Sequence, residues 1–218
     1  MFGFIIKGGP VMIPIILGSI FGLAIVIQKF CIFRQIKVST FDFVMEIFTA
    51  LKANRIKNAL ELCERYSNHP LAAIFKIGIQ RRDLPLERLE KILEQAGNNQ
   101  VQKMEKFLGA LISIINIEPL LGFLGTITGL ICAFMSWENA GANVTVSVLA
   151  AGIYEAMITT AAGLTVAIPL YLCYHYFVSR IKIISNELTN HCIQFLEVLS
   201  EIKEAAPNED KRPKRLSS

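Results

Sequence analysis

The sequence reads EPLLGFLGTITG at residues 118–129 and GIYEAMITTAAG at residues 152–163. Both stretches belong to long apolar segments, yet both carry hydroxyl groups, and the second carries a carboxyl group in its middle. At membrane depth a polar group costs several kcal/mol unless it faces protein or a water-filled cavity. We therefore expect these two segments to line an ion path.

The composition indicates an integral membrane protein. Of the 218 residues, 53% are hydrophobic and 18% are charged, and the mean hydropathy is +0.47. A soluble domain of this size carries more charge, and here the apolar residues gather in blocks. The net charge of +4 comes without a basic stripe interleaved with aromatic residues, so we expect no nucleic-acid partner. The scattered cysteines and histidines have no metal-ligand spacing, and no nucleophile–base set stands out, so we expect no metal, no cofactor and no enzyme activity.

Three segments are long enough to cross a membrane as helices. Residues 10–27 contain no charge over 18 residues, about 27 Å of helix. A cleaved signal peptide is the alternative for this segment, but the apolar block is longer than usual and no cleavage site closes it. The expected parts are an N-terminal segment with the first membrane helix at 1–33, a helical domain at 34–107, a second membrane helix at 108–137, a loop at 138–145, a third membrane helix at 146–178, a helical extension at 179–206 and a disordered tail at 207–218.

The positive charges predict the orientation. Residues 34–106 contain 13 lysine or arginine residues and residues 180–215 contain seven, whereas the loop at 138–145 contains none. Positively charged segments stay on the cytoplasmic side of a membrane. We therefore expect a bacterial inner-membrane protein with a periplasmic N-terminus and a cytoplasmic C-terminus. The loop at 138–145 is then periplasmic, and the helical parts at 34–107 and 179–206 are cytoplasmic.

The segments outside the membrane also have a helical pattern. Residues 34–107 predict three or four amphipathic helices, because apolar residues recur at helical spacing and two prolines suit first turns. We expect the last of these helices to run from Leu86 into the second span without a break. After the third span, an apolar heptad stripe from Ile181 to Ile202 continues the helix, and Pro207 is expected to end it.

Small residues recur on one face of the second and third membrane segments and predict close helix packing. Their spacing of three and four residues lets helix backbones approach each other in lipid. Packing alone is the alternative to an ion path, because threonine in a membrane helix often bonds the carbonyl four residues earlier. The expected packing residues are Gly122, Gly125, Gly129, Gly152, Ala156 and Gly163.

Glu155 favours an ion path over packing alone, because a carboxyl group at membrane depth is rare and usually functional. Thr159 follows Glu155 by one turn, while Thr160 lies about 140° around an ideal helix from it. Glu155 and Thr160 therefore cannot both face one narrow lumen, and the periodicity leaves open which of them does. Glu118 is a further acid near the inner end of the second span. Because the spans hold no chain of acids, a second polypeptide must bring another titrating group.

Three motifs resemble the ExbB/TolQ branch of the MotA/TolQ/ExbB proton-channel family. They are GGPVMIPI at residues 8–15, PLLGFLGT at residues 119–126, and GIYEA at residues 152–156, which continues to AIP at 167–169. Their order and spacing agree with the family, and most closely with its ExbB members, over nearly the whole chain. By motif position, the residues that match the family's lumen threonines and the glutamate of its third helix are Thr126, Thr160 and Glu155.

The resemblance implies an all-α membrane protein of three transmembrane helices with long cytoplasmic helical extensions, assembled as a homopentamer around a central lumen. An ExbD- or TolR-like partner would place single-span helices in that lumen, each with an aspartate. Proton flow would then energise a TonB- or TolA-like protein that reaches toward the outer membrane. The expected ion-path residues are Thr126, Thr160, Glu155 and Thr159.

Two positions depart from the family pattern. Glu118 stands where alanine is usual, and Ala151 stands where proline is common. Glu118 adds a carboxyl group near the inner mouth, and the sequence leaves its role open. Two alternatives to an ExbB-like role remain, a TolQ-like subunit of the Tol-Pal envelope-maintenance system and an assembly scaffold that conducts nothing. The lack of further polar ligands beside the threonines favours protons over sodium.

Overall fold

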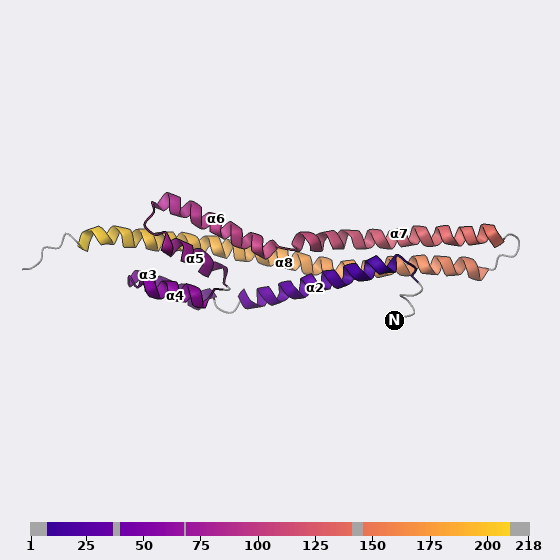
Figure 1. Cartoon of the computed structure of the whole chain (residues 1–218), viewed down its shortest axis with the longest axis horizontal. Coiled ribbons are helices and arrows are strands. Elements are labelled where there is room, and N and C mark those ends of the chain that lie inside the picture. The colour runs from indigo at the N-terminus through magenta and orange to yellow at the C-terminus, as the bar shows by residue number, and fades with distance from the viewer. Residues whose placement is uncertain (1–7, 37–39, 68, 141–145, 210–218) are drawn as a thin grey trace, which may run out of the picture. The chain divides into compact units, whose positions relative to one another are not determined.

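Figure 1 shows the computed structural model, which describes residues 8–36, 40–67, 69–140 and 146–209. Every regular element in these ranges is an α-helix, which confirms the all-α class. The predicted disordered tail lies outside the described residues from position 210 onward, as does most of the loop expected at 138–145. The helices are α2 (Met12–Ile36), α3 (Thr40–Lys52), α4 (Ile56–Arg65), α5 (Pro70–Gln80), α6 (Leu86–Glu105), α7 (Leu108–Ala140) and α8 (Val146–Glu209).

The chain forms two compact units. The first comprises residues 1–30 and 106–178, and the second comprises residues 31–105 and 179–218. Three helical stretches of the described chain are long and apolar enough to cross a membrane, namely Met12–Arg34, Leu86–Asn139 and Gly152–Lys203. In the first unit, large apolar side chains on α2, α7 and α8 remain exposed, and Leu120 and Leu172 are each 66% exposed. Such faces fit lipid or neighbouring apolar helices.

In the first unit, α7 and the N-terminal part of α8 run antiparallel and side by side (Figure 1). The contacts of their glycines show the register. Gly122 lies against Thr160, Gly129 lies against Ala156, and Gly152 lies against Ala133. Residue numbers rise along one helix as they fall along the other. Small side chains therefore let two backbones approach closely over several turns, which suits a helix pair in lipid.

Helix α2 lies against both α7 and α8 in the same unit. A Cβ atom built on Gly18 would overlap the Glu118 side chain of α7. One built on Gly22 would lie 2.5 Å from the Leu170 side chain of α8. The chain enters α2 through Gly8 and Gly9. Gly9 has a φ of +66°, a left-handed conformation that glycine adopts with little strain. This turn and the two glycines of α2 allow the close approach of all three helices.

The second unit has an aromatic core that joins α5 to the C-terminal part of α8. The rings of Phe75 and Phe195 stack with centroids 4.7 Å apart and an interplanar angle of 11°. The neighbouring Gly78 leaves room for the Phe195 ring, which a Cβ atom there would overlap. Just before α6 begins, the Leu84 carbonyl accepts a hydrogen bond from the Lys203 Nζ of α8 at 2.6 Å. The extension of α8 thus serves as the support on which the second unit packs.

Two boundaries differ from the sequence-based expectation. The helix expected to continue from Leu86 into the second span is interrupted, because Phe107 adopts a φ of +68° between α6 and α7. A left-handed residue breaks the helical hydrogen-bond ladder, so α7 begins anew at Leu108. Helix α8 continues to Glu209, beyond Pro207, where an end was expected. A proline removes one backbone donor, and here its loss does not end the helix.

Candidate functional site

Thr126 of α7 and Thr160 of α8 lie together in the first unit. Their Oγ1 atoms are 2.5 Å apart, and both lie within hydrogen-bond distance of the Gly122 carbonyl oxygen, at 3.2 Å from Thr126 and 2.9 Å from Thr160. Both side chains are half-buried. The two hydroxyl groups are thus held at one point where the two helices touch, and we call them the threonine pair.

The threonine pair offers two hydroxyl hydrogens to this arrangement of three oxygens. Each hydroxyl donates one hydrogen bond at a time and can accept two. At least one of the three oxygen–oxygen contacts therefore lacks a hydrogen at any moment, and rotation of either hydroxyl changes which one it is. A group that can reverse its hydrogen-bond direction with little movement is suited to pass a proton or to stabilise a passing water.

The expected packing glycines create this close approach. A Cβ atom on Gly122 would lie 3.0 Å from the Thr160 Cα, and one on Gly163 would lie 2.5 Å from the Glu118 carbonyl oxygen. Both neighbours are backbone atoms, which cannot rotate away. Gly129 similarly faces the backbone at Ala156. The predicted small-residue faces of α7 and α8 are therefore the faces that these helices turn toward each other.

Thr159 lies between the two helices. It is 1% exposed, its side chain packs against Gly125, and its Oγ1 donates to the Ala156 carbonyl at 2.8 Å. A Cβ atom on Gly125 would overlap the Thr159 hydroxyl. Within one chain, therefore, Thr159 is a packing residue bonded to its own helix. Its neighbour Thr160 instead reaches across to Gly122 of α7.

Glu155 lies away from the threonine pair. Its carboxyl group lies against Gly9, so closely that a Cβ atom there would overlap Oε1. The side chain is half-buried. Five residues separate Glu155 from Thr160, about 7.5 Å of helix rise. Within the chain, Thr160 thus points to α7, and Glu155 points to the turn that begins α2.

Glu118 also points toward α2. The side chain is 1% exposed, and Oε1 lies where a Cβ atom on Gly18 would be. The other oxygen, Oε2, has no hydrogen-bond partner among the described residues. The sequence placed Glu118 at an inner mouth but did not identify its contact with α2. Gly18 and Gly22 repeat the small-residue spacing of the other two spans, and that signal in the first span was available in the sequence.

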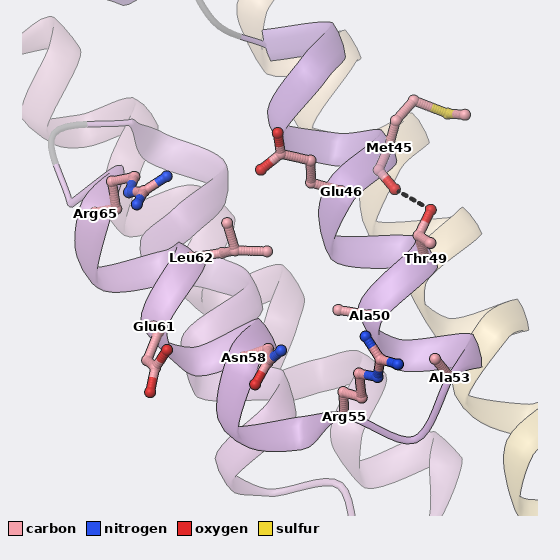
Figure 2. Close-up of a pocket in the computed structure, with 10 residues that line it drawn as sticks. All are labelled: Met45, Glu46, Thr49, Ala50, Ala53, Arg55, Asn58, Glu61, Leu62 and Arg65. Carbon is pink, nitrogen blue, oxygen red and sulfur yellow. Dashed lines mark hydrogen bonds between the residues drawn. The ribbon is translucent and has the colours of Figure 1, made fainter.

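The second unit contains an open groove of about 510 Å³ between α3 and α4. Figure 2 shows Thr49 donating to the Met45 carbonyl on one wall, at 2.7 Å. The charged side chains around the groove are Glu46, Glu61, Arg55 and Arg65, two of each sign. Across the described residues, histidine, cysteine, aspartate and glutamate form no group of three or more that could hold a metal ion. The groove therefore offers no arrangement with an evident chemistry.

Burial shifts the pKa of His69 and of Cys63 in the second unit. His69 is 8% exposed, and its Nδ1 accepts a hydrogen bond from the Leu71 N–H at 3.3 Å, which caps the start of α5. Burial, and to a smaller extent the nearby His191, lowers the pKa of His69 to about 4. Burial raises the pKa of the Cys63 thiol to about 11. Both groups are therefore neutral at physiological pH, which suits a structural role.

A model of the MotA/TolQ/ExbB proton channel family matches residues 66–190, a stretch that contains the threonine pair, Glu155 and Glu118. The match covers more than half of the chain. The chain belongs to the MotA/TolQ/ExbB proton channel family. The described helices and the family together make it a membrane protein with three apolar helices that fit a bacterial inner membrane.

Relatives within the family include both ExbB and TolQ proteins. An ExbB-like biopolymer transport protein of Synechocystis sp. is 30% identical, over 80% of this chain and 69% of its own. The biopolymer transport protein ExbB of Neisseria gonorrhoeae is 31% identical, over 66% of this chain and 64% of its own. The Tol-Pal system protein TolQ of Haemophilus influenzae is 30% identical, over 50% of this chain and 47% of its own. Identity alone does not separate the two groups.

Proposed function

We propose that this chain is the proton-channel and motor subunit of an inner-membrane complex that uses the proton motive force to energise a TonB-like protein. The observation that carries the proposal is the threonine pair, because Thr126 and Thr160 share the Gly122 carbonyl at the contact of two apolar helices. Hydroxyl groups at this depth can stabilise a proton or a water molecule that crosses the apolar layer.

The channel needs a partner that supplies a second titrating group. The threonine pair contains no acid, and Glu155 is directed toward Gly9 in the same chain. An ExbD-like protein with one spanning helix and one aspartate would provide the missing carboxyl group beside the threonine pair. The exposed apolar faces of α7 and α8 support a homopentamer whose lumen receives such helices. In this assembly the N-terminus is periplasmic, and the second unit and the C-terminus are cytoplasmic.

The available energy suits small steps. One proton that crosses 100 mV releases about 2.3 kcal/mol. This is enough to bias a rotation or shift of the partner helices and too little to unfold a protein domain. Each working step therefore moves the partner slightly, or several protons combine in one step.

A TolQ-like role is the second candidate, and the 30% identity to the TolQ protein of Haemophilus influenzae favours keeping it. The mechanism at the threonine pair is the same in both roles, and the difference lies in the partner. Copurification of the chain with the products of neighbouring genes distinguishes them, once peptide sequencing identifies the copurified proteins as an ExbD–TonB-like pair or a TolR–TolA-like pair.

Proton flux tests the proposal. The chain and its single-span partner are reconstituted into liposomes, a potassium gradient sets the membrane potential, and an internal dye records pH. The proposal expects uptake that needs both proteins and that Glu155→Ala, Thr126→Val or Thr160→Val reduces. A non-conducting scaffold would assemble with the partner, as mass measurement of the complex would show, and give no uptake above that of empty liposomes.

A further inference from the structure

Glu118 is a buried acid that the proposed channel at the threonine pair does not use. It is 1% exposed, and Oε2 has no hydrogen-bond partner among the described residues. It also takes part in no ion pair within the part of the chain that the structure describes. A carboxylate removed from water without a counter-charge costs much more free energy than the neutral acid does. The site therefore suits a carboxyl group that carries a proton.

The surroundings of Glu118 form a fitted site between three helices. On α2, Gly18 leaves the space that the carboxyl group occupies, and a Cβ atom there would also lie 3.7 Å from the Ile114 side chain. On α8, Gly163 lets the backbone of α7 approach so closely that a Cβ atom would lie 2.5 Å from the Glu118 carbonyl oxygen. A glycine on each neighbouring helix thus brings α2, α7 and α8 together at this residue.

Pro119 leaves a backbone carbonyl of α7 without its helical donor near Glu118. It lies inside α7 and has no N–H to donate to the carbonyl of Ile115, four residues earlier. Ile115 precedes Glu118 by three residues, so the two lie on one face of the helix. A protonated Glu118 carries a donor, whereas an ionised one does not. The helix therefore lacks one donor on the face where the acid could supply one.

Other charged or titratable groups are remote from Glu118 along each helix. On α8 the nearest are eight residues from Gly163, about 12 Å of rise, and on α2 the nearest is 11 residues beyond Gly18, about 16 Å. On the chain that leads into α7 the nearest is 12 residues away, about 18 Å. None of them is placed to neutralise a carboxylate at Glu118. These groups are Glu155 and Tyr171 on α8, Lys29 on α2, and Lys106 before α7.

We propose that Glu118 is a reversible proton-binding site inside the subunit, enclosed by α2, α7 and α8 and separate from both the threonine pair and Glu155. The ligand is a proton, because one carboxyl group and one freed helix carbonyl are too few oxygen ligands to replace the hydration shell of a metal cation. Release of the proton leaves a charge that needs water, and water can reach it when α2 separates from α7. Proton binding at Glu118 therefore couples to the packing of α2.

Infrared spectroscopy of the purified full-length protein tests this site without any partner or gradient. In liposomes, pH steps up and down reveal the stretching band of protonated carboxyl groups, and exchange into D₂O identifies it. The proposal expects a protonated-carboxyl band that changes reversibly with pH and that Glu118→Gln removes. Glu155→Gln is the matched control, and it leaves the band assigned to Glu118 in place. If the spectrum of Glu118→Gln equals that of the wild type, the proposal is wrong.

A second pair of variants tests the enclosing site while Glu118 remains. Gly18→Ala displaces the carboxyl group, so its band shifts in frequency or disappears. Gly22→Ala is one turn away on the same helix, and its Cβ atom meets Leu170 instead of the acid. It leaves the band unchanged. An equal effect of the two alanines, or no effect of either, would overturn the proposed site even if Glu118→Gln failed to fold. Because no flux is measured, this result is independent of the proposed channel activity.

Discussion

The substitution Gly163→Ala tests whether the contact of α7 with α8 sets the geometry of the threonine pair. The new Cβ atom would lie 2.5 Å from the Glu118 carbonyl oxygen and 3.4 Å from the Gly122 Cα. Ordinary contact begins near 3.4 Å, so the helices must separate locally by about 1 Å. Gly163 lies about one turn from Thr160, so this separation reaches the threonine pair. The distance of 2.5 Å between the hydroxyl oxygens then increases toward ~3.5 Å, beyond a hydrogen bond.

The expected cost follows from overpacking and from the weakened hydrogen bond. Overpacking of a tight contact costs about 1–3 kcal/mol, and the hydrogen bond adds about 1 kcal/mol. Gly163→Ala is therefore expected to destabilise the protein by about 2–4 kcal/mol, less about 1 kcal/mol of gained helix propensity. Unfolding of the purified protein in mixed micelles by increasing fractions of a denaturing detergent measures this difference.

Gly109→Ala is the matched control for this prediction. Gly109 also lies in a membrane helix, but apart from its chain neighbours and the nearby backbone of its own helix no atom lies within 4 Å of its built Cβ position. The control is expected to be as stable as the wild type or slightly more stable, because alanine favours a helix over glycine. If Gly163→Ala and Gly109→Ala have the same stability, the two helices are not in the close contact described here, and the reasoning fails.

Two further predictions concern a titratable cap and a helix break. Because burial lowers the pKa of His69 from 6.5 to about 4, the unfolded segment binds a proton below pH 6.5 that the folded one does not bind until about pH 4. The stability from this group is therefore present above pH 6.5 and is lost as the pH falls, by about 2 kcal/mol at pH 5. When the pH is lowered from above 6.5 to 5, hydrogen exchange of the α5 amides is expected to quicken about thirtyfold more in the wild type than in His69→Asn. The asparagine keeps a capping acceptor but does not titrate. An equal pH response of the two proteins would contradict the assignment. Phe107→Gly is expected to stabilise the protein by about 1 kcal/mol, because glycine removes the strain of a φ of +68°. The same detergent titration measures it, and a loss of stability would mean that contacts of the Phe107 ring outweigh the strain.

The sequence predicted a close-packing face of small residues on each of the two segments, but not that the two faces contact each other. The glycines at 122, 125 and 129 recur at helical spacing, as do Gly152, Ala156 and Gly163, and in lipid such faces have few other uses than close packing. The structure brings these faces together. It also places Thr126 beside Thr160, although they are 34 residues apart in the sequence. That contact depends on the register of two helices, which periodicity within either helix does not determine.

The contacts of Glu155 and Glu118 could not be predicted from the sequence, for a different reason. Glu155 and Glu118 both contact the first span, Glu155 at Gly9 and Glu118 at Gly18. The angle between Glu155 and Thr160 showed that the two must diverge, but not where each points. Both acids are on helices far from residues 8–18 in the sequence, and the turn at Gly9 depends on its positive φ. Tertiary packing determines these contacts, and the spacing of residues along one helix does not predict them.

The break before α7 also had no sequence signal. Phe107 is neither glycine nor asparagine, the residues that usually adopt a left-handed conformation. Apolar periodicity therefore predicted one helix from Leu86 onward. In contrast, the cap of α5 has a clear local pattern, because Pro70 occupies the first turn and His69 accepts from the Leu71 N–H. Local chemistry predicts helix starts better than it predicts breaks imposed by packing.

In the proposed function, the hydroxyl groups of the threonine pair carry the proton path. Proton flux into liposomes containing the chain and its single-span partner tests it most directly, with Thr126→Val and Thr160→Val compared with Thr128→Val and Thr165→Val. The control hydroxyls lie on the same two helices, but they are exposed and bond only to their own helix. We expect each variant of the pair to lower the flux about tenfold or more, since loss of one hydrogen bond worth about 1.4 kcal/mol has this effect on a rate. We expect each control to keep the wild-type flux. Equal flux in all four variants and the wild type would contradict the account.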